Sequence, residues 1–275
     1  MTLALLPERR TLPDLTRMAR DAPAFTLLAI LLCLALVPLY AALTLDLRSF
    51  QGESPWMKPV KFHYALGLYT ITLAGFARFM PDATRQSRRW RWFTSAVVLA
   101  ILGEVAWLSA AAMQNTASHF NTDHPVFAAV YPLMGALAVL LTSASLVMGV
   151  SILRNPATGL APALQVALGL GLILTFLLTV PVAGYLSSQT GHVVGTSTRD
   201  LWLLGWARDA GDLRVAHFLA THALHLVPLA GLLAHWLAPS RARPLVWAIA
   251  AVYAALVAFT FVQALQGRPF LPFIG

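Results

Sequence analysis

Seven long hydrophobic runs, separated by shorter polar segments, dominate the pattern along the chain. Each is close to or above the length of about 20 residues that an α-helix needs to cross the hydrocarbon core of a bilayer. The runs cover residues 23–45, 60–80, 92–113, 126–153, 161–186, 214–238 and 244–265. The pattern predicts an all-α, polytopic transmembrane helical bundle of seven spans, with a cytoplasmic N-terminal segment at 1–22 and a single domain at 23–275.

The composition agrees with a protein that lies almost wholly within a membrane. Of its 275 residues, 58% are hydrophobic and 11% are charged, whereas about a quarter of the residues of a soluble domain are charged. In a soluble protein, a formal net charge of +8 would indicate nucleic acid as a binding partner. Here the positive residues lie in short loops beside the spans, so membrane lipids are the expected partners and nucleic acid is not.

The distribution of lysine and arginine predicts the orientation of the spans. With the N-terminus inside, 12 of the 19 lysine and arginine residues fall in cytoplasmic segments and 7 fall outside. Cytoplasmic loops carry the excess of positive charge in membrane proteins, so this split favours an N-in, C-out topology. The outside connections at 46–59, 114–125 and 187–213 are also the longer ones, and a functional site is therefore expected on that side.

The histidines are unevenly distributed over the predicted topology. Of eight, seven map to the outer face or to the helix halves that open onto it, and His235 is the exception. The seven are His63, His119, His124, His192, His217, His222 and His225. Ionisable groups at membrane depth are costly and indicate function by default. A histidine-rich site is therefore predicted at the outer boundary.

The start of the sixth run holds the densest group of candidate ligands. His222 and His225 fall about 60° apart on a helix of 3.6 residues per turn, and His217 completes a broad arc with them. At 1.5 Å per residue, His225 lies roughly 12 Å deeper than His217. Pro228 is expected to kink the helix. We take these three histidines as candidate metal ligands.

Asp212 and Arg214 stand at the beginning of the same helix. A carboxylate at this place can cap the helix N-terminus and complement its dipole. Asp212 can instead pair with Arg214, or accept a hydrogen bond from a histidine that binds a metal and so orient it. Both residues are candidates for a catalytic role.

Glu104 is the only acidic residue well inside a predicted span. A nearby cation stabilises a buried carboxylate, and Lys58 and Lys61, at the outer entry of the second run, are the only lysines of the chain. Lys58 is expected to extend to the interface. Lys61 either does the same or neutralises Glu104. Alternatively, burial keeps Glu104 neutral and lets it carry protons.

The connection between the third and fourth runs is rich in ligand-type side chains. His119, Asp123 and His124 can coordinate a metal, or they can belong to a hydrated loop that ends before the next helix. In the metal interpretation His119, or less favourably His63, completes the ligand set of the sixth run.

Imidazole is the commonest protein ligand for zinc, copper and haem iron. No standard zinc motif is present, so zinc, iron and copper all stay open. One haem b held by His63 and His222 is an alternative. A zinc hydrolase similar to the seven-span alkaline ceramidases is another, from which the chain departs because its seventh run contains no histidine.

Three motifs carry a resemblance to a family. They are Pro-Trp-Met-Lys-Pro-Val-Lys-Phe at 55–62, Ser-His-Phe-Asn at 118–121 and Gly-Asp-Leu-Arg-Val-Ala-His-Phe at 211–218. With them the chain resembles uncharacterised bacterial multi-pass inner-membrane proteins over most of its length. The resemblance implies an inner-membrane location. Together with the predicted topology, this location means that the site faces the periplasm. It implies no activity.

A membrane-embedded enzyme is the leading functional expectation. It would use a metal or haem centre for redox or hydrolytic chemistry on a lipophilic small molecule that enters from the bilayer. His217, His222 and His225 would supply ligands, and Glu104 would move a proton or neutralise Lys61. The alternatives are a proton-coupled transporter that uses the same groups, and a structural or assembly protein whose histidines serve helix packing.

Overall fold

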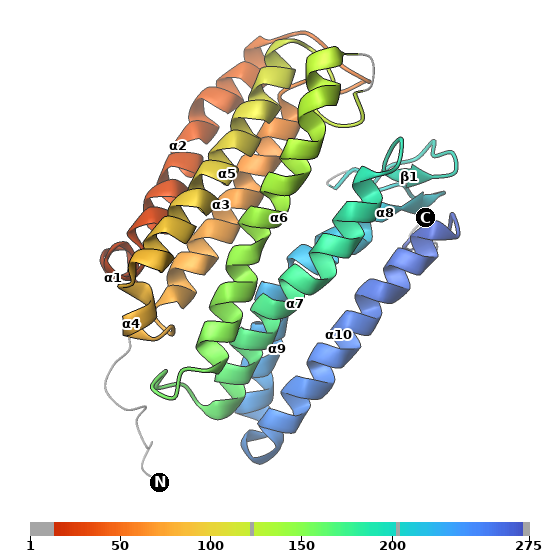
Figure 1. The fold of residues 1–275 in the computed structure, drawn as a ribbon. Coiled ribbons are helices and arrows are strands. Elements are labelled where there is room, and N and C mark those ends of the chain that lie inside the picture. The colour runs from red at the N-terminus through yellow and green to blue at the C-terminus, as the bar shows by residue number, and fades with distance from the viewer. Residues whose placement is uncertain (1–13, 122–123, 202–203, 272–275) are drawn as a thin grey trace. The chain divides into compact units, whose positions relative to one another are not determined.

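The computed structural model describes residues 14–121, 124–201 and 204–271, and nearly all regular structure in them is helical (Figure 1). The chain forms two compact units. The N-terminal unit comprises the chain up to Ser118 together with Arg154–Leu160. The C-terminal unit comprises His119–Leu153 and the chain from Ala161 onward.

The described helices support a multi-pass membrane protein. Five are long and apolar enough to cross a membrane, and a bent pair makes a sixth. The five are α2 (Pro23–Leu45), α5 (Arg88–Met113), α6 (Pro125–Leu153), α7 (Pro162–Ser187) and α10 (Ala242–Leu265) with the preceding 3-10 turn η1 (Pro239–Arg241); the pair is α8 (Leu213–Thr221) and α9 (Ala223–Leu237).

The predicted second span is the 21-residue helix α3 (Met57–Ala77). It is not one of the six because Lys61 and His63 lower the hydropathy of its first half. Seven spans therefore stay a prediction.

The N-terminal unit is built from α2, α3 and α5, with two short helices at one end, α1 (Leu15–Asp21) and α4 (Asp82–Arg85). Arg85 joins these two helices, because its guanidinium pairs with Asp21 at 2.5 Å and also with Asp82. At the same end, Phe25 meets Trp90 edge to face with ring centroids 6.3 Å apart. Ser87 caps α5 by accepting a hydrogen bond from the amide of Trp90.

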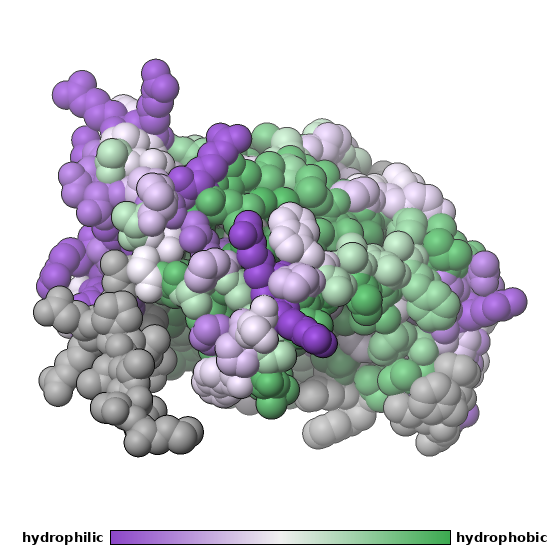
Figure 2. Space-filling model, turned by 90° about the horizontal axis from the view of Figure 1, so that it is seen from below, coloured by the Kyte–Doolittle hydropathy of each residue, from purple (hydrophilic) through white to green (hydrophobic). Residues whose placement is uncertain are grey.

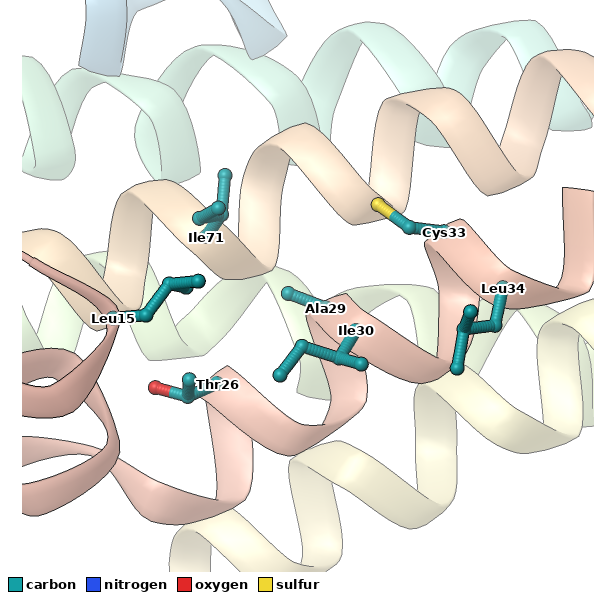
Figure 3. Close-up of a pocket in the computed structure, with 7 residues that line it drawn as sticks. All are labelled: Leu15, Thr26, Ala29, Ile30, Cys33, Leu34 and Ile71. Atoms are coloured by element: carbon teal, nitrogen blue, oxygen red, sulfur yellow. The ribbon is translucent and has the colours of Figure 1, made fainter.

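A groove of about 160 Å³ lies between α1, α2 and α3 of this unit (Figure 3). Its lining is apolar apart from two side chains, Thr26 and Cys33. The hydroxyl of Thr26 already donates to the carbonyl of Ala22. The groove therefore offers hydrocarbon contact and no acid–base chemistry.

The C-terminal unit centres on α7, which packs against α6 on one side and against α8, α9 and α10 on the other (Figure 1). Gln165 donates to the carbonyl of Ile152 where α6 gives way to α7. At the opposite end, the two-residue strands β1 (Val193–Val194) and β2 (Gly211–Asp212) pair antiparallel just before α8 begins.

Glycines bring α7 close to its neighbours. A Cβ added to Gly171 would lie 2.7 Å from Cδ of Pro228 and 2.9 Å from the carbonyl oxygen of Ala223. Gly149 of α6 has a similar contact, because its added Cβ would lie 2.8 Å from the carbonyl oxygen of Gly169. Small residues at such crossings let membrane helices approach closely and gain van der Waals contact.

The surface of the molecule is largely hydrophobic. Large apolar side chains such as Val37 of α2, Leu99 of α5 and Val252 of α10 are about 70% exposed. Figure 2, a view from below, shows hydrophobic residues over much of the visible surface, with hydrophilic residues among and beside them. An exposed apolar surface of this extent is typical of a protein that faces lipid.

The glycine contact of α7 gives a stability test with an internal control. We expect Gly171→Ala to destabilise the protein by about 1–3 kcal/mol, because the added methyl overpacks the contact with α9. Gly184→Ala in the same helix has nothing within 4 Å of its added Cβ and should be neutral or slightly stabilising. Thermal unfolding in mild detergent measures both, and equal melting temperatures would refute the close packing.

Candidate histidine site at a helix break

The sixth predicted span is interrupted at His222. α8 ends at Thr221, α9 begins at Ala223, and their axes differ by 56°. The sequence predicts one helix over 214–238 with a kink at Pro228. The structure corrects this, because the bend lies six residues earlier. The hydroxyl of Thr221 donates to the carbonyl of Phe218, a backbone contact that often bends helices.

Side chains from two neighbouring helices satisfy the backbone at this break. The amide of Leu224 donates to the hydroxyl of Thr175 in α7 at 2.8 Å. The hydroxyl of Tyr253 in α10 donates to the carbonyl of Leu219 at 2.6 Å. Unpaired backbone groups are costly away from water, and irregular backbone at membrane depth persists only when other groups satisfy it. The break is therefore stabilised by the surrounding fold.

His222, at the break itself, is held on two sides. Its Nδ1 lies 2.9 Å from the carbonyl oxygen of Phe218, and its ring stacks on the Phe218 ring with centroids 4.0 Å apart. The same Nδ1 also lies 3.2 Å from the hydroxyl oxygen of Thr221. A carbonyl oxygen can only accept, so with Nδ1–H directed at Phe218 a neutral ring keeps the lone pair of Nε2. This is the arrangement by which proteins fix the tautomer of a histidine that binds a metal.

The other two candidate histidines, one in α8 and one in α9, lie near His222. The His225 ring lies 5.3 Å from the His222 ring, in agreement with the predicted shared face. His217 is close enough to His222 to interact with it electrostatically. Its Nδ1 is buried and has no hydrogen-bond partner among the described residues.

Asp212 caps α8 and pairs with Arg214. One carboxylate oxygen accepts from the amide of Arg214 at 2.9 Å, and the other accepts from the amide of Ala207 at 2.9 Å. The Arg214 guanidinium binds the same carboxylate at 2.6 Å. The structure thus combines two of the three predicted roles of Asp212, helix capping and ion pairing.

Three further candidate histidines of the C-terminal unit have aromatic or backbone neighbours. The His119 ring lies 5.5 Å from that of Tyr131, and the His124 ring lies 4.9 Å from that of Phe127. The carbonyl of His192 accepts from the amide of Leu213 at the start of α8. Asp123 lies outside the described residues.

Glu104, Lys61 and His63 belong to the N-terminal unit. Glu104 is 5% exposed, and its Oε1 is buried without a hydrogen-bond partner in the described part of the chain. Its electrostatic partner is the half-buried Lys58. Lys61 is exposed, as in the alternative in which it extends to the interface, and its predicted role toward Glu104 stays a prediction. His63 is buried, and its Nδ1 lies 2.8 Å from the carbonyl oxygen of Pro59.

Within residues 14–121, 124–201 and 204–271, no three His, Cys, Asp or Glu side chains gather so that they could hold a metal ion. The predicted shell of His119 with His217, His222 and His225 is therefore not supported. Sequence reasoning also missed Thr175 and Tyr253. Their only signal is a hydroxyl group within an apolar run, which is too common to single them out.

No protein-family model, no curated protein and no solved structure matches the chain. The resemblance to uncharacterised inner-membrane proteins consequently stays a prediction. The assignment of a function rests on the geometry of the site alone.

Proposed function

We propose that this protein is a bacterial inner-membrane enzyme whose site is the histidine group at the break between α8 and α9. In this proposal His222 binds haem b or a metal ion, and the chemistry is redox or hydrolytic, with a lipophilic substrate. The supporting observation is the contact of His222 Nδ1 with the Phe218 carbonyl at 2.9 Å, an arrangement that leaves Nε2 of a neutral ring for a metal.

The ligand geometry favours a group that brings ligands of its own. A structural zinc needs four protein ligands and a catalytic zinc usually three, a set that the described residues do not assemble. A porphyrin supplies its own nitrogens to the iron, so one or two imidazoles from the protein suffice. A metal ion bound by His222 and His225 would take its other ligands from water or substrate.

The surroundings of the site favour a lipophilic substrate. α9 exposes Leu226, Leu229 and Leu233 along the helix that begins at the break. A substrate dissolved in the bilayer could approach along this apolar surface without crossing water. Once bound, the group at His222 would supply the redox or Lewis-acid chemistry, and His217 and His225 would exchange protons with the substrate.

The first test is the haem and metal content of untagged protein purified in mild detergent. We expect close to one haem, iron, zinc or copper per chain in the native protein, and a loss of at least roughly tenfold in His222→Ala, because the variant lacks a ligand. His235→Ala, in the last turn of α9, is the matched control and should keep the group. Folded native protein without haem or metal, or full retention in His222→Ala, would refute the proposal.

We further propose seven spans with an N-in, C-out topology. α5 provides the test, because Arg89 and Gln114 are exposed residues at its two ends. Cysteines at these positions, in a Cys33→Ser background, should react differently with a membrane-impermeant maleimide applied to whole cells. Gln114→Cys is expected to react at once and Arg89→Cys only after permeabilisation. The reverse pattern would overturn the orientation.

A proton-coupled transporter is the second candidate, because Glu104 is a buried acid of the N-terminal unit that feels the charge of the half-buried Lys58. An ionisable group within a membrane helix often marks a proton path. The enzyme proposal also leaves these two residues without an assigned role.

Glu104→Gln tests the transport candidate, because glutamine keeps the shape of the side chain and cannot release a proton. If Glu104 carries protons, proton flux into liposomes that contain the variant should fall at least roughly tenfold. Glu53→Gln, at an exposed loop position of the same unit, should leave the flux unchanged. Equal flux in liposomes with native protein, with the Glu104 variant and without protein would refute transport by this route.

A further inference from the structure

A column of aromatic rings leads from the loop before α8 to the histidine site. Trp206 lies between two phenylalanines, with ring centroids 6.0 Å from Phe270 and 5.3 Å from Phe218. Phe218 in turn stacks on His222 at 4.0 Å. Trp206 therefore supports the ring that covers one face of His222.

The two neighbours of Trp206 in the chain are tied to the start of α8. The amide of Ala207 donates to the carboxylate of Asp212 at 2.9 Å, and the carbonyl of Gly205 accepts from the guanidinium of Arg214. Trp206 itself accepts from the amide of Leu201 through its carbonyl, at 2.7 Å. Its backbone is thus fixed from both sides.

Asp212 and Arg214 make these hydrogen bonds. Asp212 is buried and Arg214 is half-buried. Asp212 is 2% exposed, and both of its carboxylate oxygens accept hydrogen bonds from Arg214. Without the guanidinium, a buried carboxylate would be left without its cation, which is strongly unfavourable. The fold therefore keeps Asp212 and Arg214 together, and with them the segment 205–207.

We infer that Asp212 and Arg214 are positioning residues for His222. They hold the segment 205–207, Trp206 presses on Phe218, and Phe218 fixes the plane of the His222 ring and shields one of its faces. The inference deepens the proposed function and rests on it only in taking His222 as the working group. Asp212, Arg214 and Phe218 all belong to the motif at 211–218, so the inference assigns these three residues of the motif one role, the positioning of His222.

The test measures how fast diethyl pyrocarbonate acylates His222, by peptide mass spectrometry, with His235 as the internal reference. Trp206→Ala should raise the His222 rate roughly threefold to tenfold, the range that the loss of one aromatic pair allows. Trp206→Phe should restore most of the protection, because it keeps a ring against Phe218. Arg214→Gln should act like Trp206→Ala, and the double variant should add little, because both changes break one chain of contacts.

The control is Arg268→Gln, which removes an exposed arginine of the same unit and should leave the rate unchanged. If the purified protein carries a group on His222, the same variants are compared by how fast excess free imidazole displaces that group. Trp206→Ala and Arg214→Gln should then speed displacement by a similar factor. The two measurements are independent. Absence of a bound group refutes the proposed function, and the acylation rate of His222 still tests the positioning role.

Two results would overturn the inference. One is a His222 rate, or a displacement rate, that Trp206→Ala leaves unchanged. The other is an Arg214→Gln effect that raises the His235 rate equally, because this would reveal general loosening of the helix instead of a role that acts through Trp206.

Discussion

Backbone hydrogen bonding at the break between α8 and α9 is the constraint on which the candidate site depends. A helix that stops and restarts within an apolar environment exposes amides and carbonyls that lipid cannot satisfy. Here the Thr175 hydroxyl accepts from the Leu224 amide, and the Tyr253 hydroxyl donates to the Leu219 carbonyl. The two hydroxyls come from α7 and α10, so the break exists only when these helices are in place. His222 owes its position to their packing.

The same packing explains the small residues of the C-terminal unit. Gly171 lets α7 lie against Ala223 and Pro228, just beyond the break, which brings Thr175 within reach of Leu224. A side chain at Gly171 would push the hydroxyl of the next helical turn away from its partner. Close packing and satisfaction of the backbone are thus parts of one arrangement, and the aromatic contacts of Phe218 and Trp206 extend it to the loop before α8.

Much of the fold follows from local pattern, and the site follows only in part. Apolar length predicts the long helices, and helical spacing predicts that His222 and His225 share a face, because both depend on neighbouring residues alone. The break was not predictable, since Thr175 lies 49 residues and Tyr253 lies 34 residues from the groups that they satisfy. The choice between Lys58 and Lys61 as partner of Glu104 likewise depends on how α3 faces α5, which no spacing within α3 reveals.

Amide hydrogen exchange over residues 218–226, in protein reconstituted into lipid nanodiscs, tests most directly whether the break is built and held by its neighbours. If it is, these amides exchange as slowly as those of the flanking turns of α8 and α9, and Thr175→Val together with Tyr253→Phe speeds exchange there and nowhere else. Fast exchange in the native protein, at the rate of the exposed loops, would contradict the account, because His222 would then sit on frayed backbone instead of in a fixed site.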